Sequence, residues 1–172
     1  MLRPRTATGI AVGLICAASF TARGDVELPL QEELWAKRAI QSLRDAGRTL
    51  KRLSRDAEPA YARWLGQASE DVLGLAGRWA SALDYFGRDF PHDALRADPE
   101  RLGYARQWLR ERNAELSAQS DELVARLLAA NDGFRGGADA EQLAAARKTL
   151  EGVRTHGPSA RRSSAIAIAS SS

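Results

Sequence analysis

Apolar side chains recur three and four residues apart through most of this chain, which is the pattern of amphipathic helices. The pattern is most regular in two stretches, from about Pro29 to Ala57 and from Pro59 to about Gly87. The apolar stripe of the first stretch consists of Ala36, Ala39, Leu43, Ala46, Leu50, Leu53 and Ala57. The stripe of the second consists of Tyr61, Leu65, Ala68, Val72, Leu75, Trp79, Ala82 and Phe86. These stripes predict two long helices, each with one face against a partner helix.

A third helix is predicted from Pro99 to about Asn131. It begins with an N-cap residue, a proline at the first helical position and an acid in the first turn, at Asp98-Pro99-Glu100. Its apolar residues recur every seven positions, at Leu102, Leu109, Leu116, Leu123 and Ala130, with Leu127 and Phe134 in companion positions. Asn131-Asp132-Gly133 and Gly136-Gly137 then break the chain.

A shorter fourth helix starts at Asp139, where Gln142 completes a capping box, and its stripe is Leu143, Ala146, Leu150 and Val153. Residues 88–97 are expected to form a loop. No segment shows the alternation of a strand, so we expect an all-α fold. The arrangement predicted is an up-down antiparallel bundle of three long helices and one shorter helix. Trp35, Trp64 and Trp108 flank the stripes and are expected to be half-buried.

The two ends of the chain differ in composition from the middle. The first 24 residues contain three arginines, no acid and an apolar run from Thr8 to Phe20, as a secretory signal peptide does. We therefore expect a cleaved signal peptide over 1–24 and the helical domain over 25–155. The Ser- and Ala-rich segment 156–172 is too poor in bulky residues to pack and is expected to be a disordered tail.

The leader predicts export to the periplasm or the exterior of a bacterial cell. The excess of 22 arginines over 3 lysines is typical of GC-rich bacterial genes. Two alternatives remain open at this point: a mitochondrial presequence has the same arginine-rich, acid-free composition, and an uncleaved leader would anchor the protein to a membrane. Membrane contact is expected only if the leader is retained. Because Cys16 lies in the leader, the mature chain has no disulfide framework.

The formal net charge of +3 reflects the termini rather than the body. Five of the 25 basic residues lie outside the helical domain, at Arg3, Arg5, Arg23, Arg161 and Arg162, whereas all 22 acidic residues lie within it. The body is therefore nearly neutral and lacks the positive field of a nucleic-acid-binding protein.

No catalytic, cofactor or metal site is predicted. His92 and His156 are far apart and neither belongs to a paired helical ligand pattern. Neither a nucleophile elbow nor a phosphate-binding glycine loop occurs. Several acids have a basic residue four positions later, which predicts ion pairs on solvated helix faces, namely Glu33–Lys37, Asp84–Arg88 and Glu122–Arg126.

Two groups of residues are candidates for function. The first is a partner-contact loop with Tyr85, Arg88, Phe90 and His92, because aromatic residues and arginine are typical anchors of protein interfaces. The second is an interior polar site in the third helix, which would bind an anionic ligand and consists of Arg106, Arg110 and Asn113.

These features favour an exported, non-enzymatic helical-bundle protein that acts through contacts with a protein partner or with itself, as an accessory, adaptor or chaperone-like factor. One alternative is a ligand-binding or catalytic bundle with an arginine-lined interior. Another is a membrane-tethered coiled-coil subunit that keeps its leader.

Overall fold

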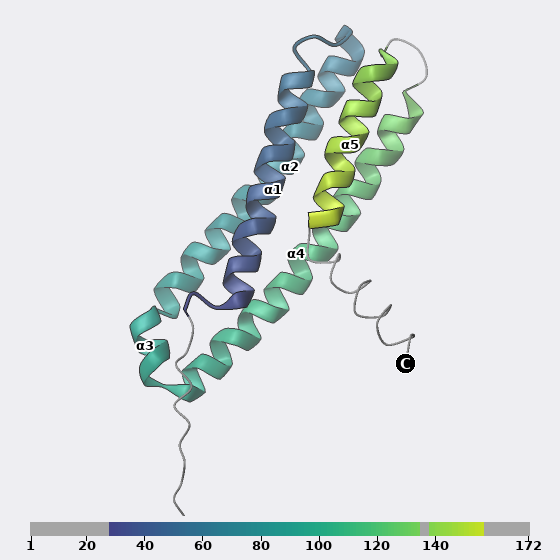
Figure 1. Cartoon of the computed structure of the whole chain (residues 1–172). Coiled ribbons are helices and arrows are strands. Elements are labelled where there is room, and N and C mark those ends of the chain that lie inside the picture. The colour runs from purple at the N-terminus through teal and green to yellow at the C-terminus, as the bar shows by residue number, and fades with distance from the viewer. Residues whose placement is uncertain (1–27, 135–137, 157–172) are drawn as a thin grey trace, which may run out of the picture.

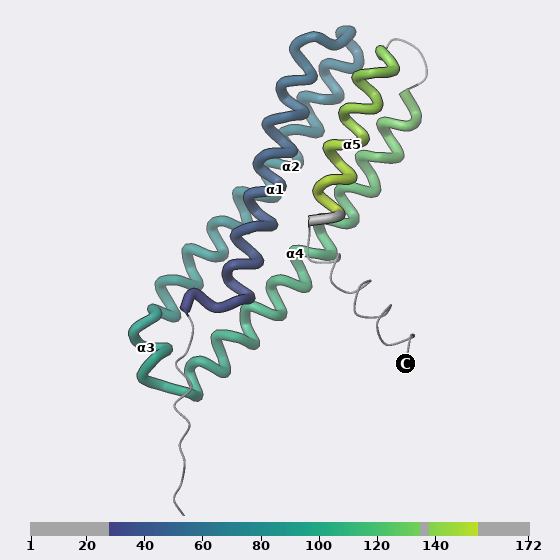
Figure 2. Tube along the Cα trace, in the orientation of Figure 1, coloured from purple at the N-terminus to yellow at the C-terminus, as the bar shows by residue number. Residues whose placement is uncertain are grey.

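The computed structural model describes residues 28–134 and 138–156, and in these ranges its regular secondary structure is helical, without strands (Figure 1). The helices are α1 (Gln31–Leu53), α2 (Pro59–Asp89), α3 (His92–Ala97), α4 (Pro99–Gly133) and α5 (Ala140–His156). Successive long helices run in opposite directions, so the predicted all-α antiparallel bundle is confirmed (Figure 2). The predicted signal peptide, the Gly136-Gly137 break and the tail beyond His156 lie outside the described residues.

The predicted apolar stripes of α1 and α2 form most of the core. In α2 every predicted stripe residue is buried except Ala82, which is half-buried. Helix α1 is shorter than predicted, because it begins at Gln31 rather than Pro29 and ends at Leu53 rather than Ala57. The residues between α1 and α2 form a turn, and Glu58 at its end has extended geometry, as expected of the residue before a proline.

The seven-residue repeat of α4 follows the buried face only over its middle part. Leu109 and Leu116 are buried, but Leu102 and Leu123 are half-buried and Ala130 is exposed. The buried stripe passes instead through Ala105, Leu109, Leu116, Ser120, Val124, Leu127 and Asn131. A straight α-helix drifts by about 20° per heptad from an exact seven-residue repeat, so a face marked at Leu102 has rotated away by Ala130.

The predicted loop over 88–97 is wrong in part, because it contains the six-residue helix α3. Leu95 is 1% exposed and packs with Leu30, Phe86, Ala105 and Leu109 in a second, smaller apolar cluster. The loop therefore closes one end of the bundle rather than lying free in solvent.

The main core lies between α1, α2, α4 and α5, and α5 accompanies α4 along only one half of its length (Figure 1). Two buried polar contacts tie these helices together. The Ser69 hydroxyl donates to the Gly47 carbonyl at 2.7 Å, and the Tyr61 hydroxyl donates to Asn131 Oδ1 at 2.6 Å. Asn131 in turn donates to the Leu143 carbonyl at 3.2 Å, which joins α2, α4 and α5. Burial raises the pKa of Tyr61 to about 12, so this hydroxyl remains a donor at neutral pH.

Candidate functional site

A groove runs between α2 and α4. Its first part has a volume of about 550 Å³ and is lined between Glu70 and Arg78 of α2 and between Gln119 and Arg126 of α4. The second part, about 360 Å³, continues to Tyr85 on α2 and to Trp108 on α4. The two parts share Arg78 and Gln119, so we treat them as one feature, the α2–α4 groove.

Both α2 and α4 direct their apolar stripes into the core, and one aromatic contact between the two segments lies toward each end of the groove. At one end the rings of Tyr61 and Phe134 lie 5.0 Å apart, edge to face. At the other, Phe86 stacks on Trp108 with ring centroids 5.5 Å apart. Between these contacts Gly74 contributes no side chain to the α2 wall of the groove, so the groove is more open at this position.

Aromatic and arginine side chains gather in the second part of the groove. Trp79 is 6% exposed at its base, Trp108 is half-buried and Tyr85 is 59% exposed at its edge. The Arg112 guanidinium lies 5.6 Å from the Trp108 ring centroid and 2.7 Å from a Glu115 oxygen. Arg88, just beyond the lining, lies 4.4 Å from the Tyr85 ring centroid. Tyrosine, tryptophan and arginine are the residues that most often dominate binding energy at protein interfaces.

The first part of the groove is more acidic. Glu70 and Asp71 of α2 face Glu122 of α4 across it, and Arg126 is paired with Asp71 at 3.0 Å. This pair spans the groove and replaces the predicted Glu122–Arg126 ion pair.

Of the three ion pairs expected from spacing, Glu33–Lys37 forms at 2.6 Å, whereas Arg88 donates to the Asp84 carbonyl instead of the carboxylate.

The predicted partner-contact residues divide into two pairs. Tyr85 and Arg88 are exposed residues of α2 and lie at the end of the groove. Phe90 and His92 also make contacts within the fold: Phe90 packs 5.2 Å from Phe86, and His92 Nε2 lies 3.1 Å from a Glu33 oxygen. Of the four residues predicted to form one contact loop, Tyr85 and Arg88 belong to α2 and lie in or beside the groove.

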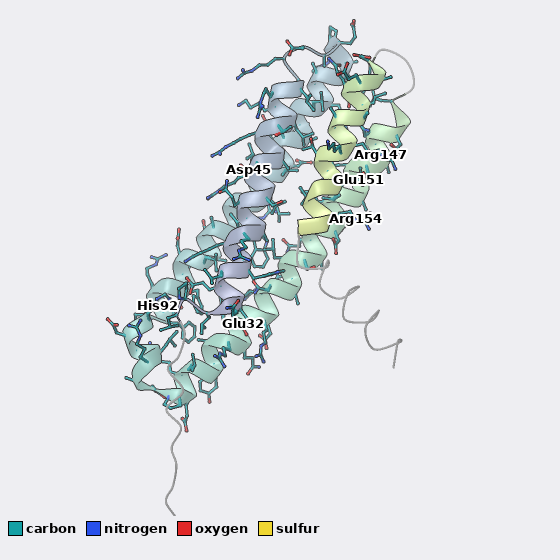
Figure 3. The ribbon with its side chains drawn as sticks, viewed as in Figure 1. Glu32, Asp45, His92, Arg147, Glu151 and Arg154 are labelled. Atoms are coloured by element: carbon teal, nitrogen blue, oxygen red, sulfur yellow. The ribbon has the colours of Figure 1, made fainter. Side chains whose placement is uncertain are left out.

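Glu33 is a buried carboxylate that links α1 to α3. It is 7% exposed and contacts Lys37 through one oxygen and His92 through the other. Burial raises the pKa of Glu33, but the hydrogen bonds and charges of Lys37 and His92 outweigh burial, and the net pKa lies below 4.5. Figure 3 shows His92 on α3 near the start of α1. The contact between Glu33 and His92 therefore links the start of α1 to α3.

The predicted interior polar site does not line an interior cavity. Arg106 and Arg110 are exposed, and Arg110 Nε lies 3.3 Å from a Glu32 oxygen. Asn113 is half-buried and donates to the Glu32 carbonyl at 2.9 Å. Arg110 and Asn113 therefore fasten the first turn of α1 to α4, and Arg106 does not join them. Arg106 faces the surface because its neighbour Ala105 takes the buried position of the helix.

The most apolar face of each helix does not reveal the groove. A second stripe on α4 steps by four and three residues through Trp108, Arg112, Glu115, Gln119, Glu122 and Arg126. This spacing places all six on one helix face, and that regularity is the signal that could have identified the α4 wall. That α2 supplies the opposite wall follows only from the three-dimensional packing.

The described residues bear on two other kinds of site. Across 28–134 and 138–156, no group of three or more His, Cys, Asp or Glu residues is placed to hold a metal ion. None of the helices in the same two ranges has both the length and the apolarity needed to cross a membrane. Comparison of the chain with family models, with curated proteins and with solved structures gives no match.

Proposed function

We propose that this protein is an accessory or adaptor protein that acts through contacts with another protein, which binds in the α2–α4 groove. The observation that supports this proposal is the composition of the groove: Trp79, Trp108 and Tyr85 lie beside Arg78 and Arg112 on an open face. Interfaces are enriched in these residue types relative to the rest of a protein surface. The groove also offers charged side chains around an aromatic base, as interface rims do.

The shape of the groove favours a macromolecule over a small ligand. Small-molecule sites commonly bury most of the ligand within a cleft or cavity. Here the lining comes from two helices only, α2 and α4, and extends from Glu70 to Tyr85 along α2. At about 1.5 Å of rise per residue this length is roughly 22 Å, which suits an extended contact with a protein element.

Site-specific photo-crosslinking in the native host tests this proposal. A benzophenone amino acid is placed at Tyr85 in the groove, at Arg78 between its two parts, and at exposed Arg38 of α1 as a control. We expect a discrete crosslinked protein from the two groove positions and none from Arg38. Equal crosslinking at all three positions, or none in the groove, contradicts the proposal.

A second variant makes the test specific for the groove. Gly74→Phe inserts a ring into the groove wall, whereas Gly77→Phe places the same ring on an exposed part of α2 that does not line the groove. We expect Gly74→Phe to abolish the crosslink from Tyr85 and Gly77→Phe to preserve it. Circular dichroism of both variants checks that the helical fold is retained.

Export is part of the proposal and rests on the composition of the first 24 residues. Intact-mass analysis of the protein purified from its host measures where the mature chain begins. We expect a start between Ser19 and Asp25. A chain that retains Met1 or Leu2 contradicts cleavage and favours the membrane-tethered alternative.

A further inference from the structure

The charge of the α2–α4 groove changes sign along its length. Toward the start of α2 it is lined by three acids, Glu70, Asp71 and Glu122, and by two arginines, Arg126 and Arg78, of which Arg78 lies at the junction and also lines the other part. The Asp71 and Arg126 charges are paired with one another. The exposed acids Glu70 and Glu122 then outnumber the shared Arg78, so the surplus at this end is negative.

The opposite end has a positive surplus. Arg78 and Arg112 line it against a single acid, Glu115, which is paired with Arg112. Arg88 adds a further positive charge over the ring of Tyr85. Trp108 and Tyr85 lie among these arginines, so this end combines an aromatic surface with positive charge.

A helix is the element whose own electrostatics match such a groove. Its N-terminus carries a partial positive charge and its C-terminus a partial negative charge. The groove is roughly 22 Å long along α2, which corresponds to about 15 residues of helix. Because Gly74 and Ala82 leave the α2 wall low, one face of a helix can approach closely.

We infer that the occupant of the groove is an amphipathic α-helix of a partner protein, bound parallel to α2. Its first half carries basic residues that meet Glu70 and Glu122, and its second half carries acidic residues that meet Arg78, Arg112 and Arg88. A large apolar side chain of this helix inserts between Trp108 and Tyr85. This inference rests on the proposed function and adds the chemistry and the direction of the partner.

Two synthetic peptides test the direction. Each is a stapled, fluorescein-labelled helix of about 18 residues with the same composition and the same apolar face. One has lysines in its first half and glutamates in its second, and the other has the reverse order. Fluorescence anisotropy with the full chain measures both affinities. We expect the lysine-first peptide to bind about tenfold more tightly, and the difference to shrink in about 0.5 M salt.

Charge-reversal variants identify the residues responsible. Arg78→Glu combined with Arg112→Glu removes the positive surplus, so we expect it to abolish the preference for the lysine-first peptide. Arg38→Glu, on an exposed part of α1, is the matched control and leaves the preference unchanged. Gly74→Phe is expected to block both peptides, whereas Gly77→Phe blocks neither.

The outcomes separate the two proposals. Equal affinity for both peptides, or tighter binding of the glutamate-first peptide, overturns the inferred direction while groove binding stands. Binding of neither peptide overturns the helical occupant, and crosslinking from Tyr85 then decides the proposed function independently. A dimer of the full chain in sedimentation equilibrium that Gly74→Phe dissociates assigns the groove to a second copy and also overturns the inference.

Discussion

Gly47 sets the distance between α1 and α2. A Cβ atom at this position would lie 2.6 Å from Leu73 Cγ and 3.3 Å from the Ser69 carbonyl oxygen. The same contact contains the 2.7 Å hydrogen bond from the Ser69 hydroxyl to the Gly47 carbonyl. The glycine is thus required by the close approach of two helices and not by an unusual backbone conformation.

A pair of glycine substitutions is expected to change stability in opposite directions. Gly77 of α2 has no atom within 4 Å of the site of its Cβ. Gly77→Ala should therefore stabilise the fold by about 0.5–1 kcal/mol through helix propensity. Gly47→Ala should destabilise it by about 1 kcal/mol, since displacement of Leu73 costs more than the propensity gains. Urea unfolding measures both, and a stabilised Gly47→Ala variant contradicts the close approach.

The stabilisation from Glu33 depends on pH. Its pKa is lowered in the folded protein, so its contribution is complete above its ordinary pKa of 4.5, where the carboxylate is charged in both states. As the pH falls further, the unfolded chain takes up the proton first and the contribution is lost. Glu33→Gln should cost about 1–3 kcal/mol near neutral pH, because the buried contacts with Lys37 and His92 are weakened.

Urea unfolding at about pH 7 and about pH 3 measures this dependence. The difference in unfolding free energy between the native chain and Glu33→Gln should shrink in acid. Glu70→Gln, at an exposed carboxylate, is the control and should show little change at either pH. A constant difference for Glu33→Gln would mean that the charge of the carboxylate contributes nothing.

Individual residue roles were the least predictable part of this chain. Spacing identified Tyr61 and Phe86 as core residues, because burial of a helix face is a local property. It did not identify the partners of Arg126 or His92, because Asp71 and Glu33 lie 55 and 59 positions away in the sequence. Long-range ion pairs depend on which helices become neighbours, and the periodicity of one helix does not contain that information.

At the scale of elements, capping and proline signals located the helices well. The Asp98 carboxylate accepts from the backbone N–H groups of Glu100 and Arg101 at 2.9 and 3.1 Å, as its sequence context predicted. Helix α2 begins at Pro59 as expected. Helix α3 was missed because six residues with a single buried leucine are too short to show a period.

The cap of α4 gives a prediction at this scale. Asp98→Ala removes the acceptor for two N–H groups and should lower the free energy of unfolding by about 0.5–2 kcal/mol. Asp98→Asn keeps an acceptor oxygen and should cost clearly less. Thermal or urea unfolding followed by circular dichroism compares the two variants. Equal losses would show that the negative charge at the helix start matters more than the hydrogen bonds.

The whole molecule has unequal ends. The main core receives side chains from four helices, whereas the second cluster around Leu95 has five buried residues. Helix α5 reinforces only the half of the bundle that lies away from α3 (Figure 1). Because local stability follows the density of buried apolar contacts, the α3 end should open more readily than the rest.

Amide hydrogen exchange in the native state measures this gradient. The amides of α3 are expected to exchange by local opening, well before those in the middle of α1. Leu95→Ala should speed exchange in α3 with a small effect on global unfolding, whereas Leu150→Ala should lower global stability by about 2–5 kcal/mol. Uniform protection across both ends contradicts an independently opening α3.

The aromatic contacts at the two ends of the groove have a kinetic consequence. Tyr61 against Phe134 and Phe86 against Trp108 hold α2 and α4 at a set separation before any partner arrives. A surface that already has its bound shape spends little conformational entropy on complex formation. Association should then follow a single exponential whose rate rises linearly with partner concentration and falls with added salt, with no slower rearrangement after the first encounter.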